Sequence, residues 1–121
     1  MDITPVTISE KLNSFSEHWT PKIIGSLNGQ HVKVAKLKGE FVMHHHDNED
    51  ELFMVIKGVL HMKLENKTIV IHQGEFVIIP KGVKHMPYAE EEVELLLFEP
   101  ASTLNTGNEL NELTKRNLDQ I

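Results

Sequence analysis

Three consecutive histidines lie near the middle of the chain, at the end of a run that reads as a β-strand. Successive side chains of a strand point to opposite faces, so His44 and His46 project together while His45 points the other way. Two neutral imidazoles on one face can bind the same metal ion, because imidazole is a good ligand for Zn, Fe, Ni, Cu and Co. The spacing therefore predicts a metal site, with His45 in a structural role on the other face.

A carboxylate close to these histidines would complete a facial triad of metal ligands. Residues 47–50 read as a turn and Glu51 opens the next apolar run, so Glu51 can lie beside the histidines on a neighbouring strand. We therefore predict that Glu51 is the carboxylate ligand. Glu49 and Asp50 are the alternatives, as ligands or as acceptors that orient an imidazole N–H, although charges in a turn are usually solvated.

A second part of the site is expected where a buried strand, residues 76–79, runs into the sequence Pro80-Lys81-Gly82. Pro80 fixes its own φ angle and Gly82 permits a positive φ, so the chain can reverse tightly at this point. The next strand would then present His85 at a defined position. A rigid turn suits a residue that holds a ligand, which makes His85 a further candidate.

The elements that must position these residues are short strands. From residue 21 onward, apolar or alternating runs are separated by turn residues, a pattern typical of an all-β sandwich or barrel. The continuous apolar run 95–98 predicts burial on both faces of its strand. Glu90 to Glu92 is expected as an acidic turn before it. About eight strands are predicted, at residues 22–27, 31–37, 41–46, 51–56, 59–64, 68–72, 76–79 and 93–98.

Short helical segments are predicted at both ends of this barrel. Apolar residues recur at near-helical spacing in residues 8–19, where Ser9 can act as an N-cap. Leucines recur at roughly helical spacing in residues 108–121, which predicts a C-terminal helical tail. The barrel core spans about residues 22–100. The 121 residues are near the usual size of one domain, so residues 1–121 are interpreted as a single domain.

Composition excludes several other classes of protein. The 12 Lys and Arg against 18 Asp and Glu give a net charge of −6, the wrong sign for neutralising the phosphates of nucleic acid. No apolar run approaches the roughly 18 residues of a membrane span, so no membrane partner is expected. The absence of cysteine removes disulfides, thiolate metal sites and a cysteine nucleophile. The first residues lack the features of a secretory signal, so the expected location is the cytoplasm.

Two motifs in this chain resemble those of the cupin superfamily, small barrels built around a metal ion. The first cupin motif, G-x5-H-x-H-x3-4-E-x6-G, is similar to the pattern at His44, His46, Glu51 and Gly58. Its leading glycine is displaced by one position, to Gly39. The resemblance covers about residues 39–98.

The second cupin motif, G-x5-P-x-G-x2-H-x3-N, resembles the pattern at Gly74, Pro80, Gly82 and His85. Ala89 stands where the motif has its final asparagine. That asparagine is not usually a metal ligand, so the difference concerns the packing of the local loop and leaves the metal interpretation intact.

The resemblance implies an RmlC-like jelly roll, a double-stranded β-helix barrel, in one all-β domain. It implies that His44, His46, Glu51 and His85 hold one divalent transition metal ion: Fe, Mn, Ni, Co, Cu or Zn. Cupins of the small cupin-2 type, including proteins labelled mannose-6-phosphate isomerase-like, catalyse isomerase, lyase or dioxygenase reactions, so such chemistry on a small molecule is expected here. Small cupins are commonly dimers, and a homodimer is expected.

A non-catalytic small-molecule-binding protein or sensor is the competing interpretation, because no general base beyond the ligands stands out in the sequence. Whether the protein is an enzyme stays open at this point. The lining of the cavity separates the two cases. A catalytic site needs a polar group near the metal-bound molecule in addition to the four ligands, whereas a wholly apolar cavity favours binding alone. Tyr88 could supply a hydroxyl, although packing is its preferred role.

Overall fold

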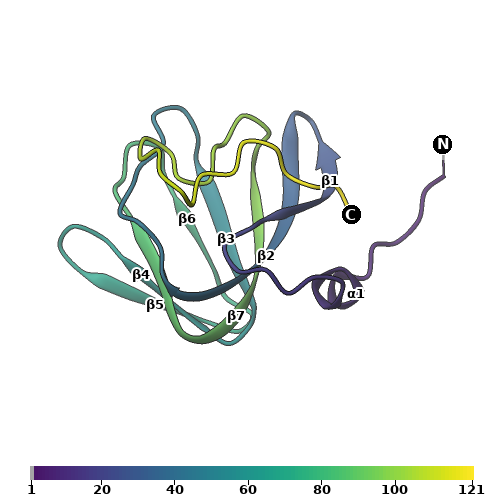
Figure 1. Cartoon of the computed structure of the whole chain (residues 1–121), viewed down its shortest axis with the longest axis horizontal. Helices are drawn as coiled ribbons and strands as arrows, with labels where there is room; N and C mark the ends of the chain where they lie inside the picture. The colour runs from purple at the N-terminus through teal and green to yellow at the C-terminus, as the bar shows by residue number, and fades with distance from the viewer. Residues whose placement is uncertain (1) are drawn as a thin grey trace.

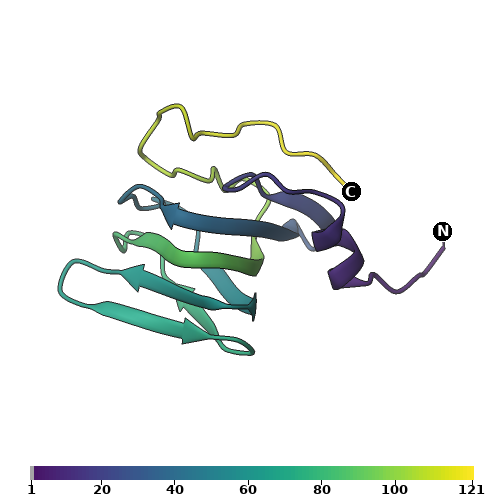
Figure 2. The same cartoon turned by 60° about the horizontal axis from the view of Figure 1, so that its bottom comes forward.

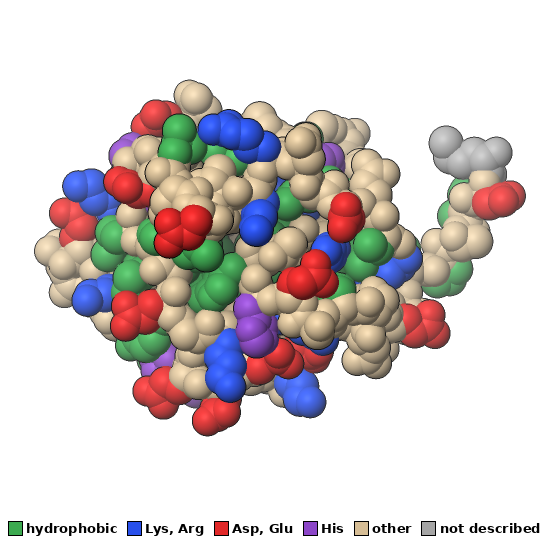
Figure 3. Space-filling model, in the orientation of Figure 1, with side chains coloured by type: hydrophobic (Ala, Val, Ile, Leu, Met, Phe, Trp, Pro, Cys, Tyr) green, Lys and Arg blue, Asp and Glu red, His purple; other side chains and the backbone are tan. Residues whose placement is uncertain are grey.

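Seven strands and one short helix make up the described part of the computed structural model, residues 2–121. Residues 2–6 extend away from the body of the molecule ahead of the helix (Figures 1 and 3). No helix in residues 2–121 has the length and apolar character needed to cross a membrane. In chain order the elements are α1 (Ile8–Asn13), β1 (Lys22–Leu27), β2 (Gln30–Glu40), β3 (Glu51–Lys57), β4 (Val59–Lys63), β5 (Thr68–His72), β6 (Phe76–Ile79) and β7 (Met86–Pro100).

All strand pairs are antiparallel, and β7 connects the two walls of the structure. The C-terminal half of β7 lies between β2 and β3 in the order β1-β2-β7-β3-β6. Its first residues pair instead with β4, which pairs with β5 (Figure 2). The fifteen residues of β7 thus bend from one wall into the other. The two walls enclose a space between them.

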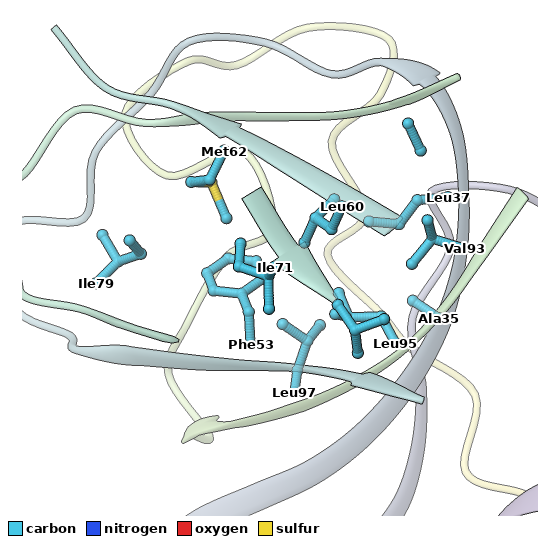
Figure 4. Packing of buried hydrophobic residues seen from close by; sticks show 12 residues of the cluster. Ala35, Leu37, Phe53, Leu60, Met62, Ile71, Ile79, Val93, Leu95 and Leu97 are labelled. Carbon is cyan, nitrogen blue, oxygen red and sulfur yellow. The ribbon is translucent and has the colours of Figure 1, made fainter. Parts of the chain in front are cut away.

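Apolar side chains from both walls fill much of this space. In β7 the inward residues alternate with outward ones, so Leu95 is 1% exposed and Leu97 is 6% exposed. Leu60 and Met62 of β4 meet them from the opposite wall, and each is fully buried (Figure 4). Burying one such side chain stabilises the fold by about 1.5–3 kcal/mol. The core is therefore formed by every second residue of these strands, the ones that point between the two walls.

The run 95–98 was expected to be buried on both faces, and the structure corrects this. Leu96 and Phe98 point to the outer face and are only partly buried. The acidic residues 90–92 do not form a turn, because they lie inside β7. The strand bends here, where the pairing with β2 shifts register between Leu37 and Gly39, and the bend leaves the three glutamates exposed.

The N-terminal helix is shorter than the predicted segment 8–19. It ends at Asn13, and residues 18–19 pair with β2 instead of continuing the helix. The backbone N–H of Trp19 donates to the carbonyl of Lys36 at 2.9 Å, and Trp19 has a positive φ of 57° that a helix excludes. The N-cap position is Thr7, not Ser9. Leu12, 1% exposed, anchors the helix on the barrel.

The predicted helical tail at residues 108–121 is wrong: this segment consists of turns and irregular chain. Polar side chains take the backbone groups that a helix would use, a competition typical of Asn and Thr. The amide of Asn105 bonds the Leu113 carbonyl and the Lys115 N–H. The segment then runs to β1, where Ile23 pairs with residues 119 and 121 (Figures 1 and 2).

The predicted strand at residues 41–46 is also absent. Within it, only His44 forms a bridge, to His85. The carbonyl of Val42 accepts a hydrogen bond from the His44 ring at 2.9 Å, so it is not free for a strand partner. Residues 41–46 therefore form an irregular segment that carries the histidine motif and is joined to His85 by one bridge.

Candidate metal centre

The two histidine motifs meet at one antiparallel β-bridge, between His44 and His85. The N–H of His44 donates to the carbonyl of His85 at 3.0 Å, and the N–H of His85 donates to the carbonyl of His44 at 2.8 Å. These reciprocal bonds hold the two residues side by side although the sequence separates them widely. They bring the first part of the site to the second.

The turn before His85 has the conformation that the sequence predicts. Gly82 has φ 83°, a conformation that favours glycine, and its N–H donates to the carbonyl of His46 at 2.7 Å. The N–H of Lys81 donates to the carboxylate of Asp50 at 2.8 Å. The turn is therefore attached to both sides of the segment that joins the first histidines to β3.

Glu49 and Asp50, the alternative carboxylate ligands, lie outside the cluster. Asp50 accepts the bond from the turn, and the Glu49 carboxylate accepts a hydrogen bond from the hydroxyl of Ser102 at 2.7 Å. Glu51, the first residue of β3, is the carboxylate that points inward with the buried face of that strand. The position of a single residue in the strand thus decides which of three neighbouring acids reaches the site.

The structure brings the four predicted ligands together in one buried cluster. One nitrogen of each of His44, His46 and His85 and one oxygen of Glu51 all lie within 4.8 Å of one another. The four residues are between 0% and 5% exposed. The Glu51 Oε1 atom is 2.8 Å from His46 Nε2 and 3.0 Å from His85 Nε2. This cluster could hold a metal ion.

The protonation of the rings fits a cation at the centre. The Nδ1 atoms of His44 and His85 each lie 2.9 Å from a backbone carbonyl, of Val42 and Val83 respectively. A carbonyl only accepts hydrogen bonds, so Nδ1 carries the proton and Nε2 of a neutral ring presents its lone pair. Such outer bonds commonly fix the tautomer of a metal-ligating histidine.

The surroundings of His46 give a second indication that the cluster suits a cation. Its Nε2 atom is buried and makes no hydrogen bond of acceptable geometry, although Glu51 Oε1 is 2.8 Å away. A carboxylate oxygen and the lone pairs of imidazole nitrogens repel one another at such distances unless a proton or a metal ion lies between them. The donor set of three imidazoles and one carboxylate is one that divalent transition metals accept.

The electrostatics of the cluster favours the protonation states that bind metal. Burial, with help from His85, lowers the pKa of His44 from 6.5 to about 4, so this ring stays neutral. Burial alone would raise the pKa of Glu51, but hydrogen bonds from His46 and His85, present when the ring nitrogen that faces the carboxylate carries a proton, outweigh it and lower the pKa to about 2. Metal ligands of these types must be deprotonated, and both groups are so at neutral pH.

His45, His61 and Tyr88 make contacts that indicate structural roles. The His45 ring points away from the cluster and lies 2.9 Å from the carboxylate of Asp47. His61 stacks on Tyr88, with ring centroids 4.8 Å apart and an interplanar angle of 13°. Tyr88 does not line the cavity described next, so its role is packing.

A cavity inside the barrel adjoins the cluster, and His44 and Glu51 form part of its wall. Most of its lining is apolar, including Phe53, Leu95 and Leu97. Two charged residues beyond the predicted ligands, Lys33 of β2 and Glu99 of β7, also line it.

Neither Lys33 nor Glu99 was predicted as a site residue from the sequence. For Glu99 a signal was present, because it continues the inward series Leu95, Leu97 at a spacing of two. For Lys33 the pattern carries no such signal, since its inward position depends on pairing with a strand far along the chain.

The C-terminal segment supports the histidine motif from outside. The N–H of His45 donates to the side-chain carbonyl of Asn108 at 2.9 Å, and the N–H of Asn108 donates to the carbonyl of His45 at 3.1 Å. Between them, Gly107 lies so close that a Cβ atom there would be 2.2 Å from the His45 carbonyl oxygen and 3.1 Å from the His44 ring. No pattern in the sequence indicates this contact, which depends on the fold of residues 101–121.

Comparison with known proteins supports the same class of fold. The family model described as "Cupin domain" matches residues 30–99. The uncharacterized protein YdbB of Bacillus subtilis is 35% identical over 79 residues, a match that spans 64% of each of the two chains.

Two solved structures resemble most of the chain. A cupin-2 domain protein from Shewanella frigidimarina superposes with a TM-score of 0.78 at 38% identity, covering 78% of this chain and 93% of that one. Protein NMB1881 of Neisseria meningitidis gives a TM-score of 0.75 at 26% identity, covering 81% of this chain and all of that one.

The fold and the cluster define an all-β jelly-roll barrel with a buried cluster of three histidines and one glutamate. The chain belongs to the cupin family, whose model matches more than half of its residues. The fold class and the family expected from the two motifs are confirmed.

Proposed function

We propose that the protein binds one divalent transition metal ion through His44, His46, Glu51 and His85 and acts on a small molecule in the adjoining cavity. The observation that carries this proposal is the convergence of buried lone pairs, with His46 Nε2 left without a hydrogen bond beside an ionised carboxylate. Fe, Mn, Ni, Co, Cu and Zn all accept this donor set.

Four protein ligands leave one or two positions of a five- or six-coordinate ion open to a small molecule. A bound ion of this kind supplies a Lewis acid that polarises a carbonyl or carboxylate, or a site for O₂ if it is iron. The chain itself contributes an apolar wall, including Phe53 and Leu97, which excludes water from the reacting group. Isomerase, lyase and dioxygenase reactions are the proposed reaction types.

Lys33 and Glu99 favour catalysis over binding alone. A wholly apolar cavity would suit a sensor, whereas these two residues place an ammonium group and a carboxyl group in the same cavity as His44 and Glu51. Proton transfer and charge stabilisation need such groups in addition to the metal ligands. We therefore propose an enzyme, with a non-catalytic binding protein as the alternative if no turnover is found.

The first experiment measures the metal content of tag-free protein by mass spectrometry of the dissolved metals. We expect about one equivalent of a transition metal in the parent and its loss in a variant carrying His44→Gln, His46→Gln and His85→Gln. His45→Gln is the matched control, because His45 stands between two of the ligands and points away from the cluster. No uptake by the parent after exposure to each of the six metals would refute the proposal.

We also propose that the protein is a homodimer. The outer face of the sheet carries two rows of apolar side chains, and the register of β6, β3 and β7 aligns them: Ile78 with Leu52 and Phe98, and Phe76 with Met54 and Leu96. Phe76 is 59% exposed and Ile78 is 53% exposed. These rows contain no charged residue, so two copies of an acidic chain can approach there, and a second copy is the occupant that we propose.

A further inference from the structure

Lys33 and Glu99 form an unusual pair inside the barrel. Lys33 pairs with Leu97 in the sheet, and Glu99 pairs with His31. Both side chains therefore lie on the inner face, as diagonal neighbours on the adjacent strands β2 and β7. Each residue is 3% exposed. Burying an ammonium group and a carboxylate costs much more than burying the leucines found at equivalent inward positions. Their presence among apolar residues needs a reason other than packing.

The pair does not satisfy the lysine. The Nζ atom lies 3.8 Å from Glu99 Oε2, too far for a hydrogen bond, and within residues 2–121 no other hydrogen bond to Nζ is found. Lys22, the other buried lysine, shows the contrast, because its ammonium group bonds Glu17 at 3.0 Å and Asp119 at 3.3 Å. Lys22 is a satisfied structural cation that does not line the cavity, whereas Lys33 lines it, and also a second pocket beside Ser102 and Thr103, with no hydrogen bond to its ammonium group in the described part of the chain.

The net charge of the cavity favours an anionic ligand. Glu51 contributes one negative charge, Lys33 contributes one positive charge, and a divalent ion on the cluster contributes two. The sum is positive whether Glu99 is ionised or protonated, and it lies inside an apolar lining, where interactions between charges are stronger than in water. An anion reduces this positive charge, and a neutral molecule of the same shape does not.

The cavity also limits the size of the part of the ligand that enters it. Its free volume is about 50 Å³. A cavity that just holds one water molecule needs less than this, so a few non-hydrogen groups can be accommodated. A carboxylate with one or two further atoms has this size.

We propose that Lys33 is the recognition residue of this cavity and binds the carboxylate of a small carboxylic acid, whose other oxygen donor faces the metal centre. This inference rests on the metal site proposed above. Glu99 has a positioning role. Its carboxyl group attracts the Lys33 ammonium group at 3.8 Å but accepts no hydrogen bond from it. A carboxylate can accept two charge-assisted hydrogen bonds from such a group.

The test uses Co²⁺-loaded full-length protein and two probes of equal size, glycolate and glycolamide, in titration calorimetry. Both probes offer a hydroxyl and a carbonyl oxygen to the ion, but only glycolate is charged. We expect glycolate to bind more tightly than glycolamide to the parent. In Lys33→Gln we expect glycolate binding to weaken by about tenfold or more while glycolamide binding stays unchanged, as for the loss of a bond to a charged group. Lys33→Arg should restore part of the preference.

Lys22→Gln is the matched control, since it removes a buried lysine outside the cavity and should leave the preference unchanged. Cobalt content and the visible spectrum of the bound ion are recorded for every variant before titration. No cobalt in the parent contradicts the metal site itself. Three outcomes with a cobalt-loaded parent overturn the role of Lys33 and leave the metal site standing. The parent binds the two probes with equal affinity, the parent binds neither probe, or Lys33→Gln keeps the same preference for glycolate as the parent. If Lys33→Gln does not fold, the comparison of probes on the parent and on Lys33→Arg decides.

Discussion

His44 and His85 exchange both backbone hydrogen bonds, and their ring centroids lie 4.3 Å apart. Each ring also bonds the carbonyl of the residue two positions earlier, at 2.9 Å in both cases. The same local arrangement therefore occurs twice, once in each motif, and the β-bridge between His44 and His85 joins the two motifs. Ligand orientation at this site therefore depends on main-chain atoms of both motifs.

The stability of the metal-free protein should fall in mild acid because of His44. Its pKa in the folded state is lowered to about 4, chiefly by burial, from 6.5. Between these values the unfolded chain binds the proton and the folded chain does not, so stability is lost as the pH falls from about 6.5 to about 4. The full loss is on the order of 3 kcal/mol. Glu51, whose pKa is also lowered, adds a further loss below about pH 4.5.

Urea unfolding of chelator-treated protein at a series of pH values measures this effect. His44→Gln should flatten the curve between pH 4 and 6.5, whereas His72→Gln, at an exposed position on β5, should not change it. An unchanged slope in His44→Gln would show that the ring is not held neutral by burial.

Glu99 should produce the opposite dependence at higher pH. Burial and the nearby Glu51 raise its pKa to about 8, although Lys33 acts against them. The folded protein then keeps a proton that the unfolded chain has released, so stability falls as the pH rises from about 4.5 to about 8. Glu99→Gln carries no charge and should reduce the loss of unfolding free energy between pH 6 and 8. The exposed β7 variant Glu91→Gln should behave as the parent does, and equal slopes in all three proteins would contradict the prediction.

Sequence spacing was enough to identify the four residues of the buried cluster but not the cavity around them. His44, His46 and Glu51 are recognisable because strand alternation and one turn relate them locally, and Gly82 marks the turn before His85. The inward position of Lys33 depends on the register between β2 and β7, which separate parts of the sequence determine. The same reason explains the C-terminal error, since leucines at helical spacing do not form a helix where other segments and polar side chains take the backbone groups.

Substitution of Gly107 should disturb the metal centre from outside it. A Cβ atom there would lie 2.2 Å from the His45 carbonyl oxygen, and the positive φ of 54° adds strain. We expect Gly107→Ala to destabilise the protein by about 1–3 kcal/mol and to weaken metal binding by displacing the segment that carries His44. Thermal unfolding and competition with a chelator measure the two effects.

Gly29→Ala separates strain from collision in this experiment. Gly29 has a positive φ of 75° but no atom within 4 Å of the position of a Cβ, so its substitution adds backbone strain alone. It should cost less stability than Gly107→Ala and leave metal affinity unchanged. Equal effects of the two substitutions would mean that the contact with His45 contributes nothing to the site.

The apolar rows on the outer sheet face predict the oligomeric state and the way to change it. Light scattering after gel filtration should give the mass of a dimer at micromolar concentration. Ile78→Lys places a charge in the middle of the proposed interface, where two copies would bring two charges together in an apolar contact, and should give a monomer.

Val70→Lys is the control for this substitution, because Val70 is similarly exposed, at 45%, but lies on β5, which does not pair with the strands β6 and β3 that carry the rows. It should leave the mass of a dimer unchanged. A monomeric parent would refute the homodimer, and a dimer that survives Ile78→Lys but not Val70→Lys would move the interface to the β4–β5 side. Metal content measured on the monomeric variant then shows whether the site needs the second copy. We expect it to be retained, because all four proposed ligands come from one chain.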